Sequence, residues 1–186
     1  MSTTTIILIA VALAVLWVIY SYNNLVSLVN QAKEAWADID VQLKRRYDLI
    51  PNLMETVKGY AKHESAVFEN VTKARAQAMR AGTPAEHSAT ENMLTSALKT
   101  LFAVSEAYPD LKANQNFLQL QKELGDTEDK IQASRRFYNT SVMALNTAEQ
   151  SFPGNIIASS FGFGPMDLFE LGSDEQAAKQ PVNVKF

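Results

Sequence analysis

The side chains best suited to carry chemistry are two histidines, each with a glutamate as its direct neighbour. His63 precedes Glu64, and His87 follows Glu86. Di-iron sites in helical bundles need Glu-x-x-His pairs that converge from facing helices, whereas adjacent residues on a helix do not face each other. We therefore assign no metal ligand and expect both histidines on the solvated surface.

The sequence also lacks the residues and motifs that other kinds of reactive site require. The chain contains no cysteine, which excludes thiolate zinc sites, disulfides and a cysteine nucleophile. The sequence has no Gly-rich phosphate loop, H-E-x-x-H element or Ser/His/Asp arrangement. Its net charge of −3 argues against nucleic acid as a partner, because such binding needs clustered excess Lys and Arg. The sequence predicts a protein without catalytic residues, cofactor or nucleic-acid partner.

Two basic clusters with aromatic neighbours remain, Lys44-Arg45-Arg46-Tyr47-Asp48 and Arg135-Arg136-Phe137-Tyr138. Within the first, Arg46 falls at an apolar position of a helical pattern. Three interpretations stay open for it: a buried pairing with an acidic side chain, an exposed position, and contact with a ligand or lipid headgroup. The buried pairing is favoured because the residue interrupts a hydrophobic seam.

The N-terminal segment predicts a membrane anchor over residues 1–24. The first charged side chain is Lys33, and the run Ile6–Tyr20 is apolar at every position. That run rises about 22 Å as a helix, and flanking uncharged residues extend it to the roughly 20 residues that a bilayer needs. A signal peptide competes less well because no basic residue precedes the run, and a buried soluble helix is the other alternative. The anchor side chains are Ile6, Ile9, Leu13, Leu16, Trp17 and Tyr20, with the aromatic ones at the interface.

A coiled-coil pattern follows the anchor. Apolar residues recur every seven positions from Val29, with a second series offset by three. Pro51 removes a backbone N–H and predicts a kink. We expect one long bent helix, or two nearly collinear ones, from about Leu25 to Arg80. The seam of this helix comprises Trp36, Ile39, Leu43, Arg46, Ile50 and Leu53.

Two further helices are bounded by local signals. Gly82 suits a left-handed helix end, Thr83 an N-cap, Pro84 the first helical position and Glu86 the capping box. The helix that begins there should end near Tyr108. The seven-residue pattern returns from Leu111 to Gln150. The predicted fold is all-α, an N-terminal transmembrane helix followed by an antiparallel up-and-down bundle of three to four long helices. The bundle spans residues 25–150.

The remaining residues, 151–186, form an aromatic and Gly-containing tail without helical periodicity. Phe161, Phe163 and Phe169 are candidate oligomer contacts, because monomers seldom expose several aromatic side chains together. Packing of the tail on its own bundle and contact with the membrane are the alternatives.

Three segments resemble the LemA family: YNNLVSLVNQAKEAWADIDVQLKRRYDLIPNLMETVKGYAKHES (22–65), FLQLQKELGDTEDKIQASRRFYN (117–139) and FPGNIIASSFGFGPMDLFE (152–170). RRYDLIPNL combined with VKGYA is the most specific part of the match. The resemblance implies a bacterial inner-membrane protein with an N-terminal transmembrane helix and a helical bundle. It supplies no catalytic residue.

These observations predict a non-enzymatic, membrane-anchored scaffold or assembly protein that self-associates. The expected partners are membrane lipid and further copies of the chain in a homo-oligomer, with other membrane proteins as a further class. The alternative is an adaptor that presents its bundle to a membrane protease or signalling complex. Lys33, Lys44, Arg45 and Arg46 follow the anchor while no basic residue precedes it, which predicts a bundle on the cytoplasmic side.

Overall fold

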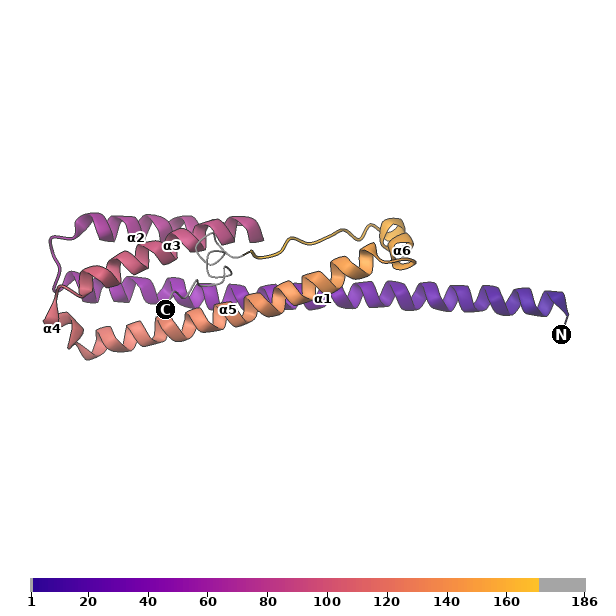
Figure 1. The fold of residues 1–186 in the computed structure, drawn as a ribbon, viewed down its shortest axis with the longest axis horizontal. Helices are drawn as coiled ribbons and strands as arrows, with labels where there is room; N and C mark the ends of the chain where they lie inside the picture. The colour runs from indigo at the N-terminus through magenta and orange to yellow at the C-terminus, as the bar shows by residue number, and fades with distance from the viewer. Residues whose placement is uncertain (1, 171–186) are drawn as a thin grey trace, which may run out of the picture. The chain divides into compact units, whose positions relative to one another are not determined.

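Helices account for almost all of residues 2–170, the part of the chain that the computed structural model describes. Their order is α1 (Thr3–Lys58), α2 (Ser65–Ala78), α3 (Pro84–Ser105), α4 (Pro109–Lys112), α5 (Gln115–Gln150) and α6 (Gly154–Phe161) (Figure 1). No strand occurs within these residues. The prediction of an all-α fold with a long apolar N-terminal helix is confirmed.

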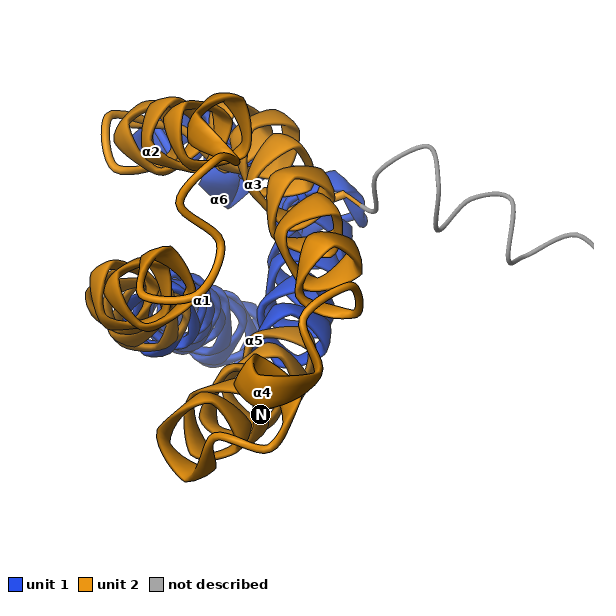
Figure 2. Ribbon diagram, turned by 90° about the vertical axis from the view of Figure 1, so that its left-hand side faces the viewer, with its two compact units in different colours: residues 1–38, 134–168 blue, residues 39–133, 169–186 orange. Residues whose placement is uncertain are grey.

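The chain divides into two compact units, coloured separately in Figure 2. Of the described residues, unit 1 contains 2–38 and 134–168, and unit 2 contains 39–133 and 169–170. Both α1 and α5 contribute one part to each unit.

Unit 2 is an up-and-down arrangement of four helical segments. The second part of α1 is followed by α2, which returns along it, then by α3 and the first part of α5 (Figure 1). Arg75 of α2 donates from Nε to the backbone carbonyl of Tyr47 in α1 at 2.8 Å, which ties the two antiparallel helices together. The predicted seam residues Ile39, Leu43, Ile50 and Leu53 are buried.

The expected helix from Leu25 to Arg80, whether one long bent helix or two nearly collinear ones, is wrong. α1 continues through Pro51 but ends at Lys58, and the chain then reverses direction into α2. The heptad pattern caused this error because apolar residues keep their seven-residue spacing through the turn, although the helix itself ends there. Tyr60 is exposed, and the buried positions shift to Ala61, Phe68 and Val71.

The start of α3 follows its sequence signals closely. The Thr83 side chain accepts from the Glu86 N–H at 3.2 Å, and the Glu86 carboxylate accepts from the Thr83 N–H at 3.2 Å. The N–H of Gly82 donates to the same carboxylate at 2.8 Å. These backbone donors hold the pKa of Glu86 below its usual range. The left-handed conformation expected at Gly82 is wrong, since Gly162 is the glycine with positive φ among residues 2–170.

Unit 1 is built from the first part of α1, the second part of α5, and α6. Its core comprises Leu25, Leu145, Ile157 and Ala158. The rings of Trp36 and Tyr138 meet edge to face with centroids 5.2 Å apart. The predicted absence of helix after residue 150 is wrong, because α6 folds directly after the turn at Phe152 and Pro153.

Candidate functional site

A group of charged side chains lies inside unit 2, around Arg46, which pairs with two carboxylates. Its Nη1 donates to Oε2 of Glu91 at 2.9 Å and lies 3.2 Å from Oε2 of Glu128. Its Nη2 donates to the Thr95 hydroxyl at 2.7 Å. The side chain of Arg46 is 5% exposed. We call Arg46, Tyr47, Glu91, Thr95 and Glu128 the polar cluster.

Tyr47 is a further hydrogen-bond donor to Glu91: its hydroxyl donates to Oε1 of that carboxylate. Burial raises the pKa of Glu91, against the opposing effects of the Arg46 charge and the Tyr47 hydrogen bond. Burial also raises the pKa of Tyr47, and the neighbouring Glu91 charge adds to this effect. The cluster therefore consists of a guanidinium, two carboxylates and two hydroxyls that bind one another.

This geometry matches the interpretation of Arg46 as a buried pairing. Taking charges out of water is expensive, and only well-made hydrogen bonds in the interior compensate for it. Arg46 has such hydrogen bonds to Glu91 and Thr95 of α3 and an ion pair with Glu128 of α5. The polar cluster is thus suited to hold the bundle together.

Sequence reasoning missed the partners of Arg46. Glu91 lies three residues before Leu94 and seven before Leu98, which are both buried. It therefore occupies an apolar position of α3. The signal that could have found the pair is a glutamate at an apolar position of one helix together with an arginine at an apolar position of another.

An open cavity of about 490 Å³ adjoins the polar cluster. It is lined from α1, α3 and α5 by Arg46, Thr95, Leu98, Lys99, Phe102, Gln121, Leu124, Gly125, Glu128 and Gln132. A Cβ added at Gly125 would meet no atom within 4 Å. The missing side chain at this position keeps part of the cavity open.

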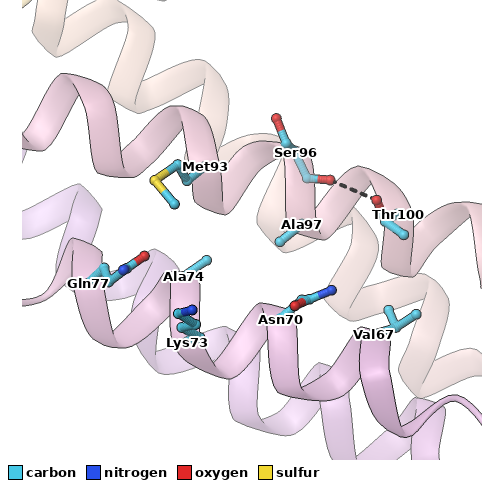
Figure 3. Close-up of a pocket in the computed structure, with 9 residues that line it drawn as sticks. All are labelled: Val67, Asn70, Lys73, Ala74, Gln77, Met93, Ser96, Ala97 and Thr100. Carbon is cyan, nitrogen blue, oxygen red and sulfur yellow. Dashed lines mark hydrogen bonds between the residues drawn. The ribbon is translucent and has the colours of Figure 1, made fainter.

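A second cavity, of about 320 Å³, lies between α2 and α3. Figure 3 shows Asn70, Lys73 and Gln77 on α2 facing Met93 and Thr100 on α3. Thr100 donates its hydroxyl to the backbone carbonyl of Ser96 at 3.1 Å. The lining mixes amide, ammonium and apolar groups.

The predicted anchor residues all lie on the exposed or half-exposed surface of α1. Ile6, Ile9, Leu13, Leu16, Trp17 and Tyr20 belong to this set. Within the described residues, α1 is the one helix long and apolar enough to cross a membrane, and none of its most apolar stretch is buried. The N-terminal part of α1 is therefore a candidate membrane span.

The three phenylalanines proposed as oligomer contacts have different environments. Phe161 is exposed, and its ring lies 4.9 Å from that of Tyr22. Phe163 is partly buried, with its ring 5.6 Å from Tyr22. Phe169 is 2% exposed, so it offers no free surface and the expectation for this residue is wrong.

The two histidines also differ from each other. His63 is exposed, as expected, whereas His87 is half-buried at the start of α3. The expectation of a solvated surface position is therefore wrong for His87. No group of three or more His, Cys, Asp or Glu side chains within residues 2–170 could hold a metal ion.

A family model described as the LemA family matches residues 35–186. The chain belongs to the LemA family. The match contains the whole polar cluster and both cavities, and it begins after the apolar run of α1.

Relatives of this LemA chain extend the similarity toward the N-terminus. It is 27% identical over 158 residues to Protein LemA of Metamycoplasma hominis, covering 83% of this chain and 71% of that protein. It is 23% identical over 187 residues to Magnetosome protein MamQ of Magnetospirillum gryphiswaldense, covering 87% and 68%. Magnetosome protein MamQ 2 of Paramagnetospirillum magneticum is similar at 22% identity with the same coverage.

Proposed function

We propose that this LemA-family protein is a non-enzymatic, membrane-anchored scaffold that self-associates in the bacterial inner membrane. The observation that carries the proposal is the N-terminal part of α1, whose apolar side chains are exposed and which has no charge before Lys33. A helix with this surface is stable in lipid, where its backbone groups satisfy one another.

The polar cluster supports a structural role for the bundle. Its charged and hydroxyl groups bind one another. Arg46, Thr95 and Glu128 also line the adjoining cavity, but the titratable pair Tyr47 and Glu91 does not belong to its lining. Catalysis needs titratable groups that converge on a space for substrate. The similarity to proteins named as magnetosome proteins also favours a part in a larger assembly over an independent enzyme.

Self-association is supported by amide side chains of α1 between the apolar run and Lys33. Asn23, Asn24 and Asn30 are exposed on α1. Asn side chains hydrogen-bond between helices in and near membranes, and identical chains usually close such contacts symmetrically.

The full-length protein in mild detergent is therefore expected to have a protein mass of several copies of its 20.6 kDa chain. Light scattering corrected for bound detergent measures this mass. The double variant Asn23→Ala, Asn30→Ala should shift the distribution toward the single chain. Asn92→Ala, which changes an exposed amide of α3, should leave it unchanged. A monodisperse monomer for the unmodified chain would contradict self-association.

The bundle is proposed to lie in the cytoplasm, with the N-terminus outside. Lys33 and the basic cluster Lys44-Arg45-Arg46 follow the apolar run, and positive charge is retained on the cytoplasmic side. A C-terminal reporter enzyme that works only after export is expected to be inactive in this fusion. The same reporter on the N-terminus is the control, and an active C-terminal fusion would reverse the orientation.

An adaptor for a membrane protease or signalling complex is the second candidate, because the cavity beside Arg46 is open along α3 and α5. An amphipathic peptide helix can bind with its apolar face in a groove between helices. Gly125→Trp would fill this cavity from a position with free space around it. Loss of a co-purifying membrane protein in this variant, with unchanged oligomer mass, would favour the adaptor.

A further inference from the structure

We propose that the outer face of α6, together with Phe152, is a second lipid contact at the bilayer surface. This inference rests on the proposed membrane crossing of α1. Phe152 is 81% exposed, Ile156 53% and Phe161 56%. These three large apolar side chains, which we call the patch, are exposed within a stretch of ten residues, and apolar surface gathered in one region often marks a contact with a partner or a membrane.

The position of α6 along α1 links the patch to the membrane. Its inner face, Ile157 and Ala158, forms the unit 1 core with Leu25, and Val18 packs against this core. Val18 belongs to the apolar run that ends at Tyr20. Tyr22 contacts the Phe161 ring. It lies only about 3 Å beyond Tyr20 along the helix axis. α6 is therefore at the depth where the candidate span leaves the hydrocarbon core.

The chemistry of the segment suits this depth. No charged residue occurs from Ser151 to Met166. The exposed hydroxyls of Ser159 and Ser160 donate to the Ile156 carbonyl at 3.1 and 2.7 Å, so neither needs a water partner. Aromatic rings favour the headgroup layer, and short amphipathic helices lie in its plane with their apolar face toward the acyl chains.

A second copy of the chain is the other possible cover for the patch. Lipid is favoured because Phe161 contacts the ring of Tyr22, which lies two residues beyond the end of the apolar run at Tyr20. Lipid already occupies the surface of that run if α1 crosses the bilayer.

Site-directed spin labelling of the full-length protein tests the proposal directly. The chain has no cysteine, so each cysteine substitution creates one labelled site. Ile156→Cys and Phe152→Cys report on the patch, and Leu13→Cys reports on the span. Met93→Cys is the matched water-exposed control, since Met93 is a helical residue with 52% exposure against 53% for Ile156. The proteins are reconstituted in phosphatidylcholine vesicles.

Collision of the label with oxygen, which concentrates in lipid, is compared with collision with a water-soluble nickel chelate. The oxygen-to-nickel ratio at Ile156 and Phe152 is expected to be several-fold higher than at Met93 and below that at Leu13. Ratios at both patch sites equal to that at Met93, with a high ratio at Leu13, would overturn the lipid contact and leave the anchor intact. A water-like ratio at Leu13 would overturn both. Spin–spin broadening at Ile156 that disappears on dilution with unlabelled protein would assign the patch to a second copy and overturn the lipid contact.

Discussion

An Arg46→Ala variant is expected to lose about 3–5 kcal/mol of unfolding free energy, the range for breaking a buried ion pair by removing one partner. The reason is the environment left behind. Glu91 is 7% exposed and would keep the Tyr47 hydroxyl but lose its cation. Glu128 and Thr95 would lose the same partner. A carboxylate that stays buried without a counter-charge accounts for most of the cost.

Denaturant unfolding in detergent, followed by circular dichroism, measures this difference. Arg45→Ala is the matched control, because Arg45 is the adjacent, exposed arginine of the same helix; its effect should be small. The double variant Arg46→Met, Glu91→Leu should recover much of the loss, since apolar residues of similar volume often replace a buried pair without penalty. Equal effects of the Arg45 and Arg46 substitutions would show that the pairing does not stabilise the bundle.

Leu43→Ala and Ile50→Ala are each expected to lower the unfolding free energy by about 2–5 kcal/mol, the range for large-to-small substitutions in cores. Both side chains are almost fully buried in unit 2. The effect combines lost apolar burial with the cavity that remains. Val41→Ala and His63→Ala are the controls, because Val41 and His63 are exposed. The same unfolding measurement applies, and comparable losses for controls and core variants would refute the seam.

Structural features that depend on a short, local stretch of sequence were predicted correctly. The apolar run Ile6–Tyr20 lies in α1, the capping box at Thr83 and Glu86 begins α3, and α5 ends at Gln150, where the seven-residue pattern stops. These signals act through residues within one or two helical turns, so no knowledge of the rest of the chain was needed. The buried seam residues follow from the same periodicity.

Features that depend on distant contacts were missed. The turn after Lys58 has no proline, and the N-cap residue of α2, Glu64, makes no side-chain capping hydrogen bond. A local stop signal was present in Gly59, which directly follows Lys58, because glycine commonly follows the last residue of a helix; the heptad pattern was given more weight. The partner of Arg46 stands 45 residues away in the chain. Burial of Phe169 likewise depends on tertiary packing: the neighbouring carbonyl of Glu170 accepts from the Ser88 hydroxyl, 82 residues away, at 2.9 Å.

The position of Arg46 within a periodic seam has one more consequence, for the alignment of the helices. Apolar seams that repeat every seven residues look nearly the same after a slip of one repeat, about 10.5 Å along a helix. Hydrogen bonds from a single guanidinium to Glu91 and Thr95 of α3, with its ion pair to Glu128 of α5, do not survive even a slip of one turn, about 5.4 Å. A single arginine therefore distinguishes the correct register of α1, α3 and α5 from shifted registers that leucine and isoleucine alone would tolerate.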